Sequence, residues 1–213
     1  MPTPHPIILH HFDQSPFSEK IRVVFGFKKL AWNSVRVSRI MPRPDLMPMT
    51  GGYRRTPTMQ IGADIYCDTQ IIIRELEARF PTPTLFPMGH AGIPWALGMW
   101  SDRPFFQNTV NRAWEQRIRA VGHGSRSEMS SQEALEIAAQ ASPQTSTLAD
   151  PDDPNGRRPG DHVSIAPDDY GKVQVHGEIV SLSAQHIAIR RHDERAGETV
   201  AHFPRAGFVL LPC

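Results

Sequence analysis

The sequence predicts a mixed α/β unit, followed by a short all-α segment and a small all-β unit. Over residues 1–87, short apolar runs alternate with stretches whose apolar residues recur every three or four positions, as in helices packed on a sheet. Residues 88–145 are polar and mostly helical in pattern, with breaks. Residues 146–213 open on a linker and then alternate polar and apolar residues, which is typical of half-buried strands. We expect the parts of the protein to have these boundaries.

The first part begins with a strand and a helix. The apolar run at residues 6–10 is consistent with a buried strand. Ser15 and Pro16 then provide a helix cap and a favourable first helical residue, and apolar residues continue at helical spacing to Lys28. Polar and apolar residues alternate over Trp32–Val37, which predicts a second strand.

A loop, a hairpin and a helix complete the first part. The Pro and Gly content of residues 41–55 predicts the loop. The two hairpin strands and the helix are expected at Thr58–Ile61, at Asp64–Cys67 and from Thr69 to Phe80. Asp68 and Thr69 are suited to cap that helix, and Pro81 ends it. This order of elements predicts a mixed sheet.

The last part is predicted to be a small barrel-like β-unit behind a linker. Residues 141–160 are rich in Pro, Asp, Gly, Ser and Thr and cannot order themselves by burying apolar surface. Four or five strands are expected, including residues 161–165, 177–182, 187–191 and 199–204, with turn residues between them. A unit of about 60 residues is marginal for independent folding, so we expect it to dock on the first part.

Composition excludes several classes of protein. The 213 residues carry a net charge of +1, divided between a basic first part and an acidic last part, so we expect no nucleic-acid partner. No apolar run approaches the roughly 18 residues that span a bilayer, and no secretory signal opens the chain, so we expect no membrane association. Two cysteines are too few for a disulfide framework or a cysteine zinc site, and the ten histidines show no metal-ligand spacing. These features predict a cytoplasmic protein without a metal.

Four segments together resemble the thioredoxin-fold domain of the glutathione transferase superfamily. They are Ser15–Arg22, Thr56-Pro57, Ile65–Thr69 and Ile72–Pro81. Each segment is weak alone, but all four occur in order and at the family's spacing over roughly residues 6–87. The resemblance implies a thioredoxin-like domain that binds glutathione as co-substrate.

The resemblance also implies roles for five residues. Ser15 would steady the glutathione thiolate, which is the nucleophile, with help from the positive end of the helix dipole. The family has a cis-proline at the position of Pro57, and if the Thr56-Pro57 bond is cis, these residues would hold the cysteinyl backbone. Asp68 and Thr69 would hold the γ-glutamyl end. Without the other three segments, Ser15 is better explained as a helix cap. Asp68-Thr69 departs from the Glu-Ser pair that many members carry.

The middle of the chain departs from the family, whose second domain has five or more helices. Gly92–Trp100 resembles the first of those helices and Val110–Arg119 one of the last, while the middle is absent. The β-tail is similar to the tails of some proteobacterial glutathione-transferase-like proteins. This departure puts catalysis in doubt more than glutathione binding.

We therefore expect a detoxification-type transferase that joins glutathione to a small-molecule electrophile, with a homodimer allowed by the resemblance. The alternative is a non-catalytic glutathione-binding or protein-interaction module that uses the C-terminal β-domain. A third alternative is a degenerate, poorly folded fragment. Binding of glutathione without conjugation would favour the module.

Overall fold

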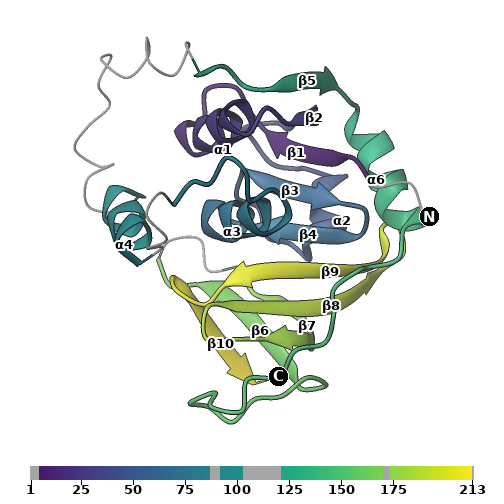
Figure 1. Ribbon diagram of the computed structural model, residues 1–213. Coiled ribbons are helices and arrows are strands. Elements are labelled where there is room, and N and C mark those ends of the chain that lie inside the picture. Colours follow the sequence, from purple (N-terminus) through teal and green to yellow (C-terminus); the bar gives the residue numbers. More distant parts are fainter. Residues whose placement is uncertain (1–4, 87–91, 103–120, 170–172, 213) are drawn as a thin grey trace.

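The computed structural model describes residues 5–86, 92–102, 121–169 and 173–212 (Figure 1). The elements are β1 (Ile7–His11), α1 (Pro16–Phe27), β2 (Ala31–Arg36), α2 (Leu46–Thr50), β3 (Thr58–Ile61), β4 (Asp64–Cys67), α3 (Thr69–Arg79), α4 (Gly92–Trp100), β5 (Ser125–Glu128), α6 (Ser131–Gln140), β6 (His162–Pro167), β7 (Val175–Leu182), β8 (His186–Asp193), β9 (Gly197–Pro204) and β10 (Phe208–Pro212). The expected helix at Val110–Arg119 lies outside the described residues.

All ten strands belong to one sheet in the order β10-β6-β7-β8-β9-β4-β3-β1-β2-β5. Its middle strands, β2-β1-β3-β4, combine a parallel β1–β2 pair with antiparallel β1–β3 and β3–β4 pairs, as a thioredoxin-like unit does. The predicted mixed α/β unit is confirmed, and β3 and β4 have the predicted boundaries. A short helix, α2, lies within the predicted loop.

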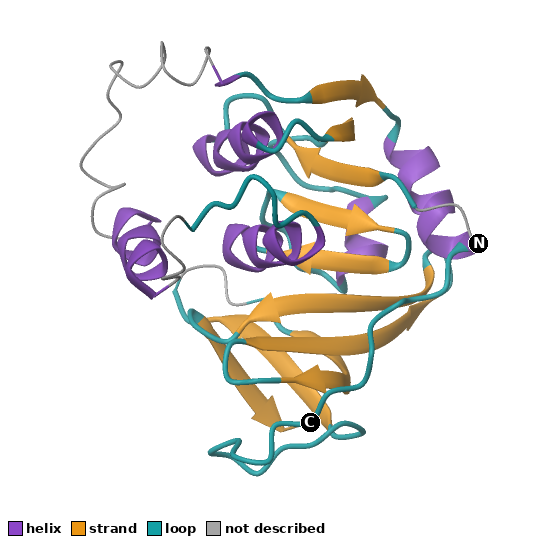
Figure 2. Cartoon of the chain, viewed as in Figure 1, coloured by secondary structure: helices purple, strands orange, loops and turns teal. Residues whose placement is uncertain are grey.

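Helices cover both faces of the central strands (Figure 2). On one face, α1 and α3 pack against each other over a core that includes Phe25, Trp32 and Ile72. On the other face, α2 and α6 cover the same strands. Because successive side chains of a strand point to opposite faces, Tyr66 of β4 enters the first core and its neighbour Cys67 enters the second.

The five C-terminal strands, which we call the β-region (residues 162–212), share the second core. Leu46 and Met49 of α2 belong to the same buried cluster as Ile187 and Phe203 of the β-region. β9 also pairs in parallel with β4, with Asp64 opposite Val200. The β-region therefore extends the central sheet, as docking on the first part requires. Among the described strands the sheet does not close, so the barrel-like arrangement is not confirmed.

The segment between the two predicted units contributes a strand as well as helices. α4 is present at the predicted residues. β5 pairs in parallel with the outer side of β2, and α6 follows with a capping box formed by Ser130 and Glu133. The division at residues 88–145 remains a prediction. No described helix is long and apolar enough to traverse a bilayer.

The predicted linker is held in place by polar contacts that converge on Asp64. This carboxylate is 2% exposed. It accepts hydrogen bonds from the backbone N–H of Gln144 at 2.8 Å, from the hydroxyl of Thr145 and from Nε2 of His202 at 3.1 Å. Nε2 of His186 in turn lies 2.9 Å from Nδ1 of His202, within hydrogen-bond distance. The linker, β4 and the β-region thus meet at one buried acid.

A close backbone approach fixes the path of the chain before β5. A Cβ at Gly26 of α1 would overlap the carbonyl oxygen of Gly122. The next residue, His123, accepts a 2.7 Å hydrogen bond from the indole N–H of Trp32. Gly26 is therefore needed for contact, although glycine weakens a helix.

We predict that Gly26→Ala destabilises the protein by about 1–3 kcal/mol, because the overlap exceeds the roughly 1 kcal/mol that alanine adds to a helix. Urea unfolding measures the change. The control is Gly98→Ala in α4, where no described atom lies within 4 Å of an added Cβ. The control should be neutral or slightly stabilising. A Gly26→Ala protein as stable as the parent would contradict the close approach.

We also predict that Asp64→Asn lowers the free energy of unfolding by about 2–4 kcal/mol at pH 7, because it breaks a buried charged network. Burial alone would raise the pKa of Asp64, but hydrogen bonds from His202, Thr145 and Gln144 hold it below its ordinary value. The stabilisation is therefore complete above about pH 4 and is lost as the pH falls through the lower folded pKa.

Urea unfolding of the parent and of Asp64→Asn across pH 2–7 checks this prediction. The difference between their free energies of unfolding should become smaller as the pH falls. The matched control is Glu198→Gln on β9, whose carboxylate is exposed and lies 3.9 Å from Arg190. That change should cost less than about 1 kcal/mol. Equal losses in the two variants would show that the network at Asp64 adds nothing beyond an exposed ion pair.

Candidate functional site

The sheet register brings the predicted site segments to one edge. His10, near the end of β1, is opposite Thr58, and Thr58 is opposite Cys67 at the end of β4. The segment after β1, the segment before β3 and the segment after β4 therefore emerge together. They carry Ser15, Thr56 with Pro57, and Asp68 with Thr69.

Ser15 is the N-cap of α1, as predicted. Its Oγ accepts the backbone N–H of Ser18 at 3.1 Å, and its residue is only 3% exposed. The hydroxyl keeps its own hydrogen for donation to another group. Ser18 is fully buried, and among the described residues its Oγ has no hydrogen-bond partner.

The Thr56-Pro57 peptide bond is cis. It lies directly before β3, so the backbone of Thr56 ends at the site edge. The preceding residue, Arg55, is anchored on both sides. Its carbonyl accepts the hydroxyl of Thr58 at 3.2 Å, and its guanidinium makes a two-armed ion pair with Asp169 of the β-region.

Asp68 caps α3 with a backbone conformation that residues other than glycine rarely adopt. Its φ is 91°, and its Oδ1 accepts the backbone N–H of Gln70 at 2.9 Å. Burial raises the pKa of this carboxyl above its ordinary value, while the Gln70 hydrogen bond and the positive charge of Lys20 oppose that rise. A left-handed φ in a residue other than glycine costs about 1–3 kcal/mol, and such residues gather at functional sites.

Two charged residues that sequence reasoning missed lie beside Thr69. Lys20 of α1 donates to Thr69 Oγ1 at 3.5 Å and pairs with Asp102 Oδ2 at 2.6 Å. Lys20 belongs to the Ser15–Arg22 segment, so the sequence alone places it near the first turn of α1. Nothing in the sequence relates Asp102 to it across 82 positions.

The arrangement suits a ligand with both anionic and cationic groups. The N-termini of α1 and α3 meet at this edge, and helix N-termini favour negative charge. Lys20 adds a cation, and Asp68 and Asp102 offer acids to an ammonium group. A hydroxyl group, the backbone of Thr56 and several charged side chains therefore occur at one edge of the sheet.

A buried network behind Ser15 keeps α1 against β1 and β2. Arg22 donates to His11 Nδ1 at 3.0 Å and to the Asp13 carbonyl at 2.8 Å, and it pairs with Glu19. Burial, together with the charges of Arg22 and Arg126, lowers the pKa of His11 to about 4. His11 is therefore neutral at pH 7 and serves as a hydrogen-bonding spacer.

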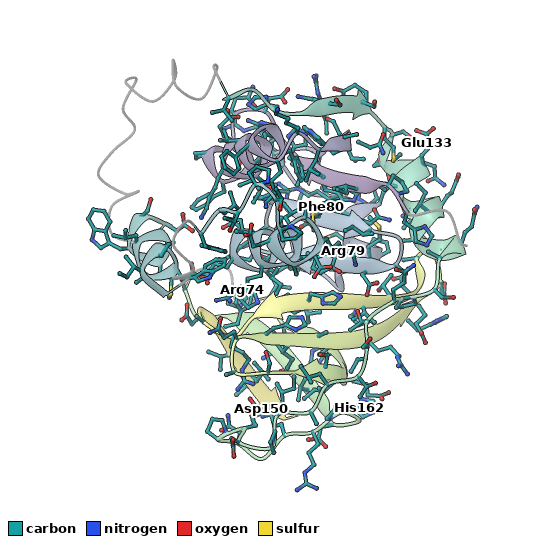
Figure 3. The ribbon with its side chains drawn as sticks, in the orientation of Figure 1. Arg74, Arg79, Phe80, Glu133, Asp150 and His162 are labelled. Atoms are coloured by element: carbon teal, nitrogen blue, oxygen red, sulfur yellow. The ribbon has the colours of Figure 1, made fainter. Side chains whose placement is uncertain are left out.

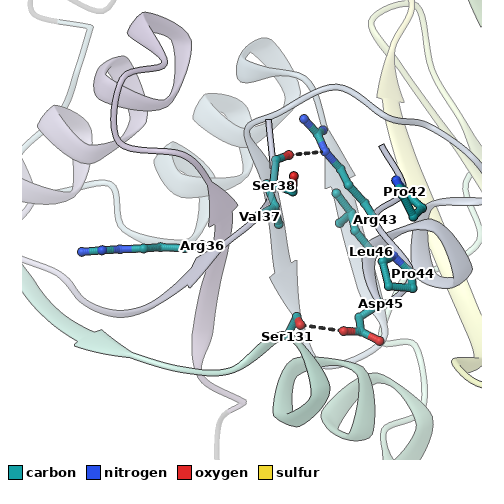
Figure 4. A pocket seen from close by; sticks show the side chains of 9 residues that line it. All are labelled: Arg36, Val37, Ser38, Pro42, Arg43, Pro44, Asp45, Leu46 and Ser131. Atoms are coloured by element: carbon teal, nitrogen blue, oxygen red, sulfur yellow. Dashed lines mark hydrogen bonds between the residues drawn. The ribbon is translucent and has the colours of Figure 1, made fainter. Parts of the chain in front are cut away.

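A separate surface pocket lies at the end of β2 (Figure 4). Nine residues line it: Arg36, Val37, Ser38, Pro42, Arg43, Pro44, Asp45, Leu46 and Ser131. None of the predicted site residues is among them. Two internal hydrogen bonds cross its wall, from Arg43 to the Ser38 carbonyl at 2.7 Å and from Ser131 to Asp45 at 2.6 Å. In the described part of the chain, no group of acidic, His and Cys residues could hold a metal ion.

Residues 9–84 match the family model described as the glutathione S-transferase N-terminal domain. A crystal structure described as a GST-like protein from Pseudomonas syringae is 33% identical, with a TM-score of 0.87, over 96% of this chain and 99% of that chain. The chain belongs to the glutathione transferase superfamily. The predicted recognition is confirmed.

Because the match covers 96% of this superfamily member, it extends into the β-region as well as the N-terminal part. A structure of FzlA from C. crescentus is 22% identical over 62% of this chain, with a TM-score of 0.42, a likeness too low to support an inference. The search of curated proteins found no match.

We predict that Asp68→Gly is more stable than Asp68→Ala by about 1–2 kcal/mol, because glycine relieves the left-handed φ and alanine does not. Both variants lose the carboxylate, so the difference isolates the backbone. Urea unfolding measures it. At Asp45, the N-cap of α2, φ is −96°, and glycine should be no better than alanine. If the glycine variant were more stable than the alanine variant by the same amount at both positions, the result would argue against backbone strain at Asp68.

Proposed function

We propose that this superfamily member binds glutathione across the edge formed by the starts of α1, β3 and α3. The observation that supports this best is the meeting of three predicted ligand segments with Lys20, which contacts Thr69. In this proposal Thr56 pairs its backbone with the cysteinyl unit beside Pro57. Asp68 and Thr69 bind the γ-glutamyl end at the α3 N-terminus, and Lys20 attracts its carboxylate.

We propose that the bound glutathione is a co-substrate. Its thiol loses a proton to water, and the Ser15 hydroxyl donates a hydrogen bond to the thiolate, which lowers the pKa of the thiol. The thiolate then attacks an electrophilic carbon of a small molecule. A C–S bond forms, and the leaving group departs with its electron pair. The chemistry needs no metal.

The wider assignments belong to the same proposal. The protein acts in the cytoplasm, in detoxification, on small molecules, and it pairs as a homodimer without membrane or nucleic-acid partners. The near-neutral net charge of +1 supports the absence of a nucleic-acid partner.

The second candidate is a glutathione-binding or protein-interaction module without catalysis. The observation that favours it is the cover over Ser15, which is 3% exposed and already caps α1. In this version the β-region, with a barrel-like curl, provides the partner surface. Asp150 and His162 lie on the side of the β-region away from α3 (Figure 3), where such a surface would be accessible.

We predict that glutathione raises the melting temperature of the parent protein, because a ligand that binds only the native state stabilises it by about 2.7 kcal/mol at a hundred times Kd. We further predict that Ser15→Ala still binds glutathione but conjugates chlorodinitrobenzene at least about tenfold more slowly. Thermal shift and the absorbance of the conjugate measure the two effects.

The matched control is Ser130→Ala, because Ser130 also caps a helix through its hydroxyl but caps α6. This variant should lose comparable helix stability and conjugate at the parent rate. Conjugation by Ser15→Ala at the parent rate would remove Ser15 from the mechanism. If the parent bound glutathione without any conjugation, the non-catalytic module would be favoured. The absence of a thermal shift on adding glutathione would contradict glutathione binding.

A further inference from the structure

The β-region holds the chain segment that leads into Thr56. This segment, residues 44–55, contains α2 and has no strand of its own. Arg195 donates to the Pro44 carbonyl and to Asp45, both at 2.6 Å. Thr199 donates to the Met49 carbonyl at 3.3 Å. Residues of the β-region therefore satisfy backbone groups that this segment cannot pair internally.

Contacts continue along the segment toward the site. Arg191 donates to the Pro48 carbonyl at 3.2 Å, and its guanidinium fills the space where Gly51 would carry a side chain. Gly51 has a φ of 68°, so only glycine fits both the turn and the contact. Gly52 faces Val173, which precedes β7.

The last contact before the ligand segment is the ion pair of Arg55 with Asp169. Asp169 follows β6, and its two carboxylate oxygens face both terminal nitrogens of Arg55, at 3.3 Å for Nη1 to Oδ2. The side chains are 23% and 41% exposed, so solvent weakens the pair without removing it. Two parallel contacts fix orientation as well as distance.

Arg55 is adjacent to Thr56 in the chain and also acts on the α3 N-terminus. Its positive charge is close enough to Asp68 to oppose the rise in the pKa of that carboxyl. Displacement of Arg55 would therefore disturb the cysteinyl and γ-glutamyl parts of the proposed site together.

We propose that Asp169 is a positioning residue for ligand binding: through Arg55 it holds the backbone of Thr56 in the orientation that binds glutathione. This inference rests on the proposed function of the site. It gives the β-region a direct part in that function, in addition to its role in the sheet.

The test uses the full chain and isothermal titration with glutathione. Asp169→Asn should raise the Kd by about twofold to fivefold, the size expected for a partly exposed pair. Asp169→Glu keeps the charge and should lose less. In a double-mutant cycle, adding Asp169→Asn to Arg55→Gln should cause no further loss. Amide hydrogen exchange should also quicken over residues 51–56 in Asp169→Asn and stay unchanged in β1.

Glu194→Gln is the matched control, because it removes the same charge from an exposed turn of the β-region. It should bind glutathione as the parent does. An unchanged Kd and unchanged exchange in folded Asp169→Asn would overturn the inference, as would an equal loss in Glu194→Gln or additive losses in the cycle. If the parent itself failed to bind glutathione, the proposed function would fail. Exchange over residues 51–56 would then still decide whether Asp169 holds the segment.

Discussion

The parallel pairing of β9 with β4 is the interaction on which the rest of the molecule depends. Without β9, β4 would be an edge strand with unpaired backbone groups, which proteins normally cover or blunt. Pairing aligns Asp64 with Val200 and Tyr66 with His202, so both buried faces of β4 continue into β9. This register lets the α2 layer and the β-region share one core and sets Asp64 against His202.

The shared sheet joins the β-region to the central strands, and α4 packs against the same part of the molecule. The β-region contacts α2 and the segment before Thr56. α4 contacts α3 through Trp95, whose ring centroid lies 4.0 Å from the guanidinium carbon of Arg74. Figure 3 labels Arg74. Neither part is an appendage, because each supplies hydrogen bonds or packing that the central strands lack on their own.

Local signals in the sequence predicted the central elements well, and long-range contacts set the limit. Ser15 and Pro16 fix the start of α1, and the alternation around Gly62 fixes β3 and β4, because these signals act within a few residues. β5 was missed because Ser125–Glu128 is polar and mostly exposed, and only its pairing with β2 makes it a strand. The linker is ordered by Asp64, which is remote in sequence. At the candidate site, the resemblance supplied the five predicted residues, but the pairs Lys20–Asp102 and Arg55–Asp169 join positions too distant for any local pattern.

These two ion pairs also bear on why Asp68 can remain buried and strained. The left-handed φ of Asp68 and the raised pKa of its carboxyl both lower the stability of the protein, so the surrounding residues must hold Asp68 in place. Lys20 and Arg55 are the cations that oppose the rise in its pKa, and each is held by an acid from a later part of the chain. The seating of the β-region and the charge balance at the α3 N-terminus are therefore coupled. Displacement of Arg55 would remove one of the two cations that oppose the raised pKa of Asp68.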